Sequence, residues 1–307
     1  MTSISKYGDI EFGDNSEMFN FYSLFEQPFH TGTDPRFFYL SDQHKQMIDR
    51  CLRVIQDRLG FGVVLGPVGI GKSSLARVLY YRFELLADYR VSVIYDPSGA
   101  PGAILKTILR EFDQPYTYRH IDALRQAFQD FVYRETQDYG RTIVLLIDEA
   151  QTMNRHTFEL LRRLLNYEGK NEKLLQIILF GQNELAKRVI SKPNLQNRVM
   201  SWNNLVPLDS RSVAELLEYR LFVAGRKEKQ PLFTLDGVVE MNRLSQGIPR
   251  TICSVAYQAL LVGYAHRAGS INAELVREAA TVALPPRPDL NGQQEQRMNE
   301  QDEEEGE

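Results

Sequence analysis

The segment Gly66–Ser73, with the sequence GPVGIGKS, constrains this chain more than any other. Two glycines separated by four residues and followed by a lysine and a hydroxyl fit the pattern of a phosphate-binding loop. Such a loop needs glycine because its backbone must curl closely enough to aim several N–H groups at the same oxygens. Lys72 is placed to reach the β- and γ-phosphates, and the Ser73 hydroxyl to join the coordination of Mg²⁺. An apolar run before the loop and a helical pattern after it predict a strand, a loop and a helix that bind a triphosphate.

A second feature follows some seventy residues later, where the apolar run 142–147 ends in Asp148 and Glu149. An unbroken apolar run of this kind is typical of a central parallel strand that is buried on both faces. Ligands of α/β sheets lie at the carboxyl ends of the strands, where these two carboxylates fall. We therefore expect Asp148 to hold Mg²⁺, and Glu149 to orient the water that attacks the γ-phosphorus.

A third strand is predicted at 174–180, followed by Gly181 and Gln182. A polar side chain just past a strand beside the nucleotide can contact the γ-phosphate or the attacking water. Gln182 is thus a candidate sensor of hydrolysis, and the alternative is a polar residue in a loop.

The order of predicted elements indicates an α/β fold. Strands at 62–65, 89–95, 142–147 and 174–180 alternate with helices, which implies a parallel sheet with helices on both faces, the αβα sandwich of P-loop proteins. From about Leu208 the pattern is entirely helical, which predicts a small all-α lid. We expect a flexible tail (1–17), an aromatic-rich strap packed on the core with a first helix (18–58), a nucleotide-binding core (59–206), the lid (207–284) and a disordered acidic tail (285–307).

Composition restricts the environment of the chain. No apolar run is long enough to cross a bilayer and the amino terminus has no signal-peptide core, so a cytoplasmic protein is expected. The two cysteines, Cys51 and Cys253, are far apart and are predicted to be buried thiols in helices. The segment from Arg287 onward carries eight acidic residues against two arginines, which leaves the rest of the chain slightly basic.

Several linked motifs resemble those of AAA+ ATPases. They are the phosphate loop, LIDEAQ at 146–151, LFGQ at 179–182, GIPR at 247–250 and the helical lid. More closely, FEQPF at 25–29, DPRFFYLS at 34–41 and GQNEL at 181–185 resemble the ExeA/GspA-like branch of that family. The resemblance covers about residues 19 to 284.

The resemblance implies an ATPase with sites shared between subunits of a homo-oligomer, a ring or a filament. Arg198 matches the arginine that completes the site of a neighbouring subunit, with Arg188 as its rival. Arg250 matches a second sensor that reaches from the lid to the nucleotide. By analogy, Tyr39 and Leu40, with His44 less closely matched, flank the adenine. The residues implied to bind ATP in the loop are Gly66, Pro67, Val68, Gly69, Ile70, Gly71, Lys72, Ser73 and Ser74.

Stand-alone ATPases of this kind also resemble transposition regulators of the TnsC, TniB and MuB type. Secretion members of the branch continue into a membrane span and a periplasmic module, whereas this chain is expected to end in its acidic tail. The regulators form ATP-dependent rings or filaments on duplex DNA and recruit a transposase, with a target-selector protein as a further partner. The positions that correspond to their DNA-backbone contacts are Lys106, Tyr118, Arg119 and His120.

These observations lead to one expected function and three alternatives. We expect an AAA+ ATPase that uses ATP and Mg²⁺, assembles on duplex DNA, regulates transposition and disassembles on hydrolysis. The first alternative is an ExeA/GspA-like ATPase for secretion or pilus assembly that acts on a protein partner. A non-hydrolysing module in which ATP sets the oligomeric state is disfavoured by Glu149 and Arg198. A phosphoryl-transfer enzyme is disfavoured because no acceptor-binding element is recognisable.

Overall fold

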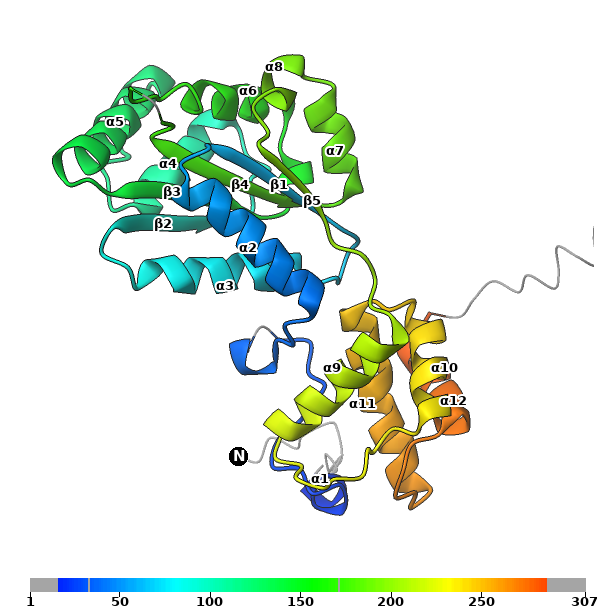
Figure 1. Ribbon diagram of the computed structural model, residues 1–307. Coiled ribbons are helices and arrows are strands. Elements are labelled where there is room, and N and C mark those ends of the chain that lie inside the picture. The colour runs from blue at the N-terminus through cyan, green and yellow to red at the C-terminus, as the bar shows by residue number, and fades with distance from the viewer. Residues whose placement is uncertain (1–15, 33, 171, 286–307) are drawn as a thin grey trace, which may run out of the picture. The chain divides into compact units, whose positions relative to one another are not determined.

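The computed structural model describes residues 16–32, 34–170 and 172–285. The chain divides into two compact units (Figure 1). We call the first, which comprises Gly32–Ser212 with Ile248–Arg250, the sheet unit. The second, the helical unit, comprises the segment up to Thr31, Val213–Gly247 and the chain from Thr251 onward. The predicted tails 1–17 and 285–307 lie outside the described residues except for their inner ends.

The sheet unit is built on five parallel strands. They are β1 (Phe61–Leu65), β2 (Tyr89–Ile94), β3 (Thr142–Ile147), β4 (Leu175–Gly181) and β5 (Ser201–Asn204), in the spatial order β2-β3-β4-β1-β5. Every neighbouring pair is parallel, so the carboxyl ends of β1, β3 and β4 meet at one edge of the sheet. The predicted fold class, a P-loop αβα sandwich followed by a helical region, is confirmed.

Helices cover both faces of this sheet (Figure 1). The helices of the unit are α2 (Asp42–Gln56), α3 (Lys72–Glu84), α4 (Pro101–Glu111), α5 (Ile121–Tyr133), α6 (Arg155–Leu164), α7 (Asn183–Ile190) and α8 (Pro193–Gln196). Two 3-10 turns, η1 (Pro35–Phe37) and η3 (Ala150–Thr152), and a π-helical turn, η2 (Arg134–Asp138), complete it.

The apolar run of β3 supplies two separate cores. Ile143, Leu145 and Ile147 pack in the core that includes α4, α5 and α6. Val144 and Leu146 pack in the core that includes α2 and α3. Because successive strand residues face opposite sides of the sheet, a strand covered on both faces must be apolar throughout.

Strand β5 was not predicted from the sequence. Its residues, SWNN, are mostly polar, and among the strands that the structure describes it lies at the edge and pairs with β1. Within it, the Asn203 amide donates to the Ser201 hydroxyl at 2.8 Å. An edge strand is half solvated, so its sequence lacks the apolar run by which a buried strand is recognised.

The helical unit contains α1 (Ser16–Phe21), α10 (Leu235–Ser245), α12 (Ala273–Ala283), and most of α9 (Ser210–Val223) and α11 (Pro249–Ala265). The expectation that the aromatic strap packs on the core is wrong for its first part. Tyr22 is buried and its hydroxyl donates to the carbonyl of Ala268 at 3.2 Å, and the Phe29 ring lies 6.0 Å from that of Phe233. Aromatic residues show that a segment is buried but not which partner covers it.

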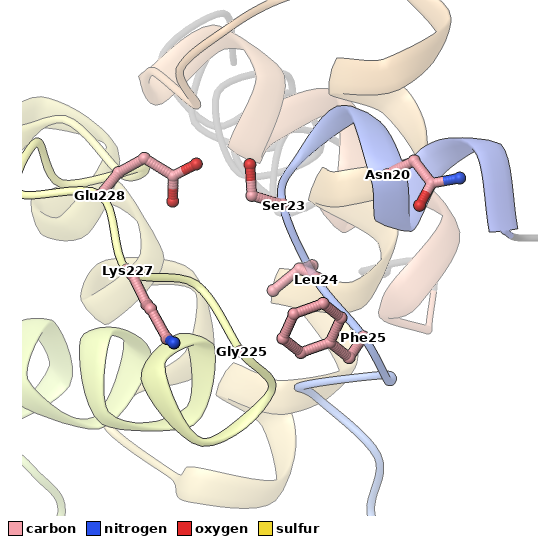
Figure 2. A pocket seen from close by; sticks show the side chains of 7 residues that line it. All are labelled: Asn20, Ser23, Leu24, Phe25, Gly225, Lys227 and Glu228. Atoms are coloured by element: carbon pink, nitrogen blue, oxygen red, sulfur yellow. The ribbon is translucent and has the colours of Figure 1, made fainter.

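A pocket in the helical unit lies between residues 20–25 and 225–228 (Figure 2). The Phe25 ring packs so closely on Gly225 that an added Cβ would lie 2.2 Å from its Cδ2 atom. Figure 2 shows Ser23 and Glu228 on opposite sides of the pocket, and their hydrogen bond lowers the pKa of Glu228. Across the described ranges, no helix combines the length and the hydropathy needed to cross a membrane.

Candidate active site

The predicted phosphate loop joins β1 to α3 and needs glycine at three positions. Gly69 and Gly71 have φ angles of +78° and +109°, in the left-handed region that side chains disfavour. A Cβ added at Gly66 would lie 3.0 Å from Ile70 Cγ2 and 3.1 Å from the carbonyl oxygen of Leu205. The Gly66 N–H donates to the carbonyl of Gly181 at 3.2 Å, which fixes the loop to the end of β4.

Lys72 begins α3 and is buried beneath the loop. Its Nζ donates to the carbonyls of Gly66 and Pro67, both at 2.9 Å. Burial lowers the pKa of Lys72, while the nearby Glu149 and then Asp148 carboxylates raise it. The Gly71 cap of α3 supplies no side-chain acceptor, so the first N–H groups of the helix remain suited to an anion.

Asp148 and Ser73 form a pair at the carboxyl end of β3. Asp148 is 3% exposed, and burial raises its pKa, while hydrogen bonds from the Ser73 hydroxyl and the Glu149 N–H lower it. The Glu149 N–H donates to Asp148 Oδ1 at 2.9 Å. A hydroxyl and one carboxylate fit Mg²⁺, which keeps several waters and binds substrate phosphates. The described residues contain no cluster of three or more His, Cys, Asp or Glu side chains that could hold a metal without such phosphates.

Glu149 leaves the sheet in an unusual backbone conformation. Its φ is +46° and its ψ is +35°, the left-handed region that costs a non-glycine residue about 1 kcal/mol or more. Among the charged groups that act on Lys72, Glu149 raises its pKa most strongly, which places the carboxylate near the ammonium group. The structure thus brings Lys72, Ser73, Asp148 and Glu149 together, and their roles in binding and hydrolysis stay predictions.

Gln182 caps the start of α7, directly after β4. Its backbone N–H donates to Oε1 of Gln151 at 3.0 Å. Since β4 lies between β1 and β3, Gln182 follows the strand that separates the loop from the two carboxylates. The role of its side chain as a sensor stays a prediction.

The two candidate finger arginines differ in their surroundings. Arg188 on α7 donates to the carbonyls of Gln151 and Met153, and its guanidinium lies 5.1 Å from the centre of the Phe158 ring. These contacts hold the side chain within its own subunit, and its role as the rival finger stays a prediction. Arg198 is half-buried between α8 and β5 and donates to the carbonyl of Leu165 at 3.1 Å. Its role between subunits stays a prediction.

Arg250 lies against the phosphate loop through its backbone. Its N–H donates to the carbonyl of Gly69 at 3.2 Å, and a Cβ added at Gly69 would lie 2.9 Å from that of Arg250. The segment Ile248–Arg250 accordingly clusters with the sheet unit. The reach of the Arg250 side chain to a nucleotide stays a prediction.

The expected adenine-flanking residues lie in the segment before α2. Tyr39 and Leu40 are both half-buried, and Leu40 packs on the core beneath α2 and α3. His44, the less closely matched of the expected residues, and Phe38 approach the loop at Gly71. A Cβ at Gly71 would lie 3.3 Å from Nε2 of the buried His44 and 3.4 Å from the ring of Phe38. Phe38 was missed because it stands in a run of aromatic residues whose individual directions the sequence does not show.

The predicted DNA contacts lie on α4 and in the segment before α5. Lys106 is half-buried on α4, and Tyr118, Arg119 and His120 are exposed. Their exposure makes them accessible to a large partner, and their contact with DNA stays a prediction.

Comparison with known proteins agrees with this geometry. Residues 55–189 match the family model described as an AAA domain. The General secretion pathway protein A of Aeromonas hydrophila is 32% identical over 249 residues, which are 80% of this chain. The matched region is 44% of that protein, so the chain spans less than half of the relative's length.

Solved structures resemble the fold at low identity. The ORC2 protein of Aeropyrum pernix, in its ADPNP-ADP complexes, has a TM-score of 0.61 at 17% identity, over 88% of this chain and 74% of its own. Drosophila ORC bound to DNA also has a TM-score of 0.61, at 16% identity, over 91% of this chain and 69% of its own. The sheet order, the phosphate loop and the family match together identify the fold as that of an AAA-type P-loop domain and support an AAA+ ATPase.

Proposed function

We propose that this chain hydrolyses ATP with Mg²⁺ in a site that two subunits of a homo-oligomer complete. The observation that carries the proposal is the convergence of Lys72, Ser73, Asp148 and Glu149 at one edge of the sheet. Together they meet three chemical requirements of phosphoryl transfer to water: Lys72 compensates charge, Ser73 and Asp148 suit metal binding, and Glu149 suits orientation of the nucleophile.

Each residue has its own role in the proposed reaction. The loop N–H groups and Lys72 bind the phosphates, and Lys72 exchanges the carbonyls of Gly66 and Pro67 for phosphate oxygens. Ser73 and Asp148 would hold Mg²⁺, and the ion would neutralise charge on the phosphates. Glu149 accepts a hydrogen bond from the attacking water and orients it towards the γ-phosphorus.

Phosphate release with and without a magnesium chelator tests this reaction. We expect hydrolysis only with Mg²⁺, and we expect Glu149→Gln to keep ATP bound while turnover falls by about 100-fold or more. Asp49→Asn, at an exposed position of α2, is the matched control and should hydrolyse ATP normally. Equal turnover in Glu149→Gln and the control would refute the assignment.

Subunit mixing tests the shared site. If Arg198 acts on a neighbour, Arg198→Ala should be inactive alone. Mixing it with the Glu149→Gln protein should restore turnover, because an intact Glu149 then meets an intact Arg198 across an interface. Full turnover by Arg198→Ala alone would show that the site is not shared through this residue.

As a cellular role we propose control of DNA transposition, in which the ATP-bound oligomer assembles on duplex DNA and recruits a transposase with a target-selector protein. The exposed Tyr118, Arg119 and His120 support this role. Sedimentation with duplex DNA should require ATP and weaken as salt is raised, because phosphate contacts release counterions. No sedimentation at low salt with a slowly hydrolysed analogue would refute it.

The second candidate role is an assembly ATPase for secretion or pilus formation. The 32% identity to the General secretion pathway protein A over 249 residues favours it. We propose a cytoplasmic site of action for either role. The secretion role predicts turnover that responds to a protein partner and not to DNA, so adding duplex DNA to the ATPase assay separates the two.

A further inference from the structure

The backbone around Glu149 is held by several contacts. Its carbonyl accepts hydrogen bonds from both the N–H and the hydroxyl of Thr152, at 2.8 and 2.9 Å. A strained left-handed residue persists only where its surroundings fix it. The turn through η3 therefore sets the direction in which the Glu149 side chain leaves the sheet.

The Gln151 side chain joins this carboxylate to the next strand. Its Nε2 donates to Glu149 Oε2 at 2.5 Å, and its Oε1 accepts the N–H of Gln182 at 3.0 Å. One amide group thus connects the carboxylate that follows β3 with the backbone that follows β4. Gln182 is also the cap of α7, so the link reaches the start of a helix.

Two further residues fix the position of the Gln151 amide. A Cβ at Gly181 would lie 2.9 Å from Gln151 Oε1, so the amide packs directly on the backbone of β4. Arg188 donates to the carbonyl of Gln151 and to that of Met153. The side chain is therefore held at its base by α7 and at its tip by the end of β4.

The chemistry of an amide suits this position. The neutral amide donor holds one carboxylate oxygen without bringing a further positive charge beside Glu149. The other oxygen has no contact of this kind from Gln151. The Glu149 charge raises the pKa of Lys72, so the carboxylate as a whole lies near that ammonium group.

We propose that Gln151 is a positioning residue, which holds the Glu149 carboxylate for the attacking water and couples it to the N–H of Gln182. This inference rests on the proposed hydrolysis of ATP at Glu149. A movement of the backbone that follows β4 then reaches the Glu149 carboxylate through the Gln151 side chain.

Two substitutions of Gln151 separate the two halves of the link. Gln151→Met removes both hydrogen bonds at nearly constant volume. Gln151→Glu keeps an acceptor for the Gln182 N–H but removes the donor to Glu149. The matched control is Gln126→Met, because Gln126 donates to the Asp130 carboxylate at 2.8 Å on the exposed face of α5.

We expect both Gln151 variants to lower kcat by about 10- to 100-fold while KM and the Kd for ATP change less than about twofold. In the nucleotide-free protein, hydrogen exchange at the backbone N–H of Gln182 should speed up in Gln151→Met, which removes its acceptor. It should stay slow in Gln151→Glu, which keeps an acceptor. In a Glu149→Ala background, Gln151→Met should cause no further loss of single-turnover rate, since residues that act together are not additive. The control should match the wild type in every measurement.

The outcomes distinguish this inference from the proposed function. A wild-type protein without turnover refutes the proposed function, while exchange at Gln182 still tests the link. If the wild type hydrolyses ATP and Gln151→Met does so equally fast, the inference about Gln151 is refuted while the proposed function stands. Additive losses in the double variant, or a parallel loss of ATP binding, would assign Gln151 a general structural role and overturn it as well.

Discussion

Replacing Arg188 by methionine tests whether this residue stabilises the sheet unit by holding α7 against the segment that follows β3. We call this set of contacts the Arg188 clamp. Methionine keeps most of the apolar stem but removes the donors to the carbonyls of Gln151 and Met153 and the contact with the Phe158 ring. Two half-buried hydrogen bonds contribute about 1 kcal/mol each and the ring contact about 0.5 kcal/mol. The free energy of unfolding of the sheet unit should therefore fall by about 2.5 kcal/mol.

Urea denaturation followed by circular dichroism measures this loss. A slope of about 2 kcal/mol per molar urea for a unit of this size converts it into a midpoint about 1 M lower. Lys187→Met, at the exposed neighbouring position of α7, removes one charge without these contacts and should change stability by less than about 0.5 kcal/mol. If Arg188→Met unfolded at the same urea concentration as Lys187→Met, the clamp would be refuted.

Three further predictions concern buried and crowded positions. Burial raises the pKa of Cys51 to about 12 and raises that of Cys253, so both thiols should resist maleimide at neutral pH until urea unfolds the chain. Burial lowers the pKa of His44 from 6.5, so the unfolded chain binds this proton more readily. Stability should be complete above pH 6.5 and fall as the pH drops towards the folded-state pKa, and His44→Met should flatten this dependence in thermal melts. Finally, Gly181→Ala places a Cβ within 2.6 Å of a neighbouring side chain and should lower ATP turnover, whereas Gly102→Ala, with nothing within 4 Å, should not.

The sequence predicted the parts of the site that depend on local pattern. The phosphate loop and the carboxylates after β3 follow from residue types at fixed spacing, and the parallel sheet from the alternation of strands and helices. Four of the five strands were recognised, because each carries an apolar run, and the polar edge strand β5 was not.

Contacts between segments distant in sequence were not predictable in the same way. The Gln151 side chain could have turned to solvent, and only the register of β3 beside β4 brings it to Gln182. The sequence gives the charge of Arg188, but its contacts with the carbonyls of Gln151 and Met153 depend on its direction on α7, which the sequence does not show. The aromatic residues before Thr31 predicted burial, whereas their partner, the helical unit, is a property of the fold.

Strand β5 gives the chain an internal optical probe. It carries Trp202, the single tryptophan of the sequence, which pairs with Val63 of β1 and is 38% exposed. All indole fluorescence of the protein therefore originates in the sheet unit. Val63, the register partner of Trp202, lies three residues before the start of the phosphate loop at Gly66. Excitation selective for indole will follow this unit alone, so that unfolding or nucleotide binding there can be recorded without a label while the helical unit stays silent.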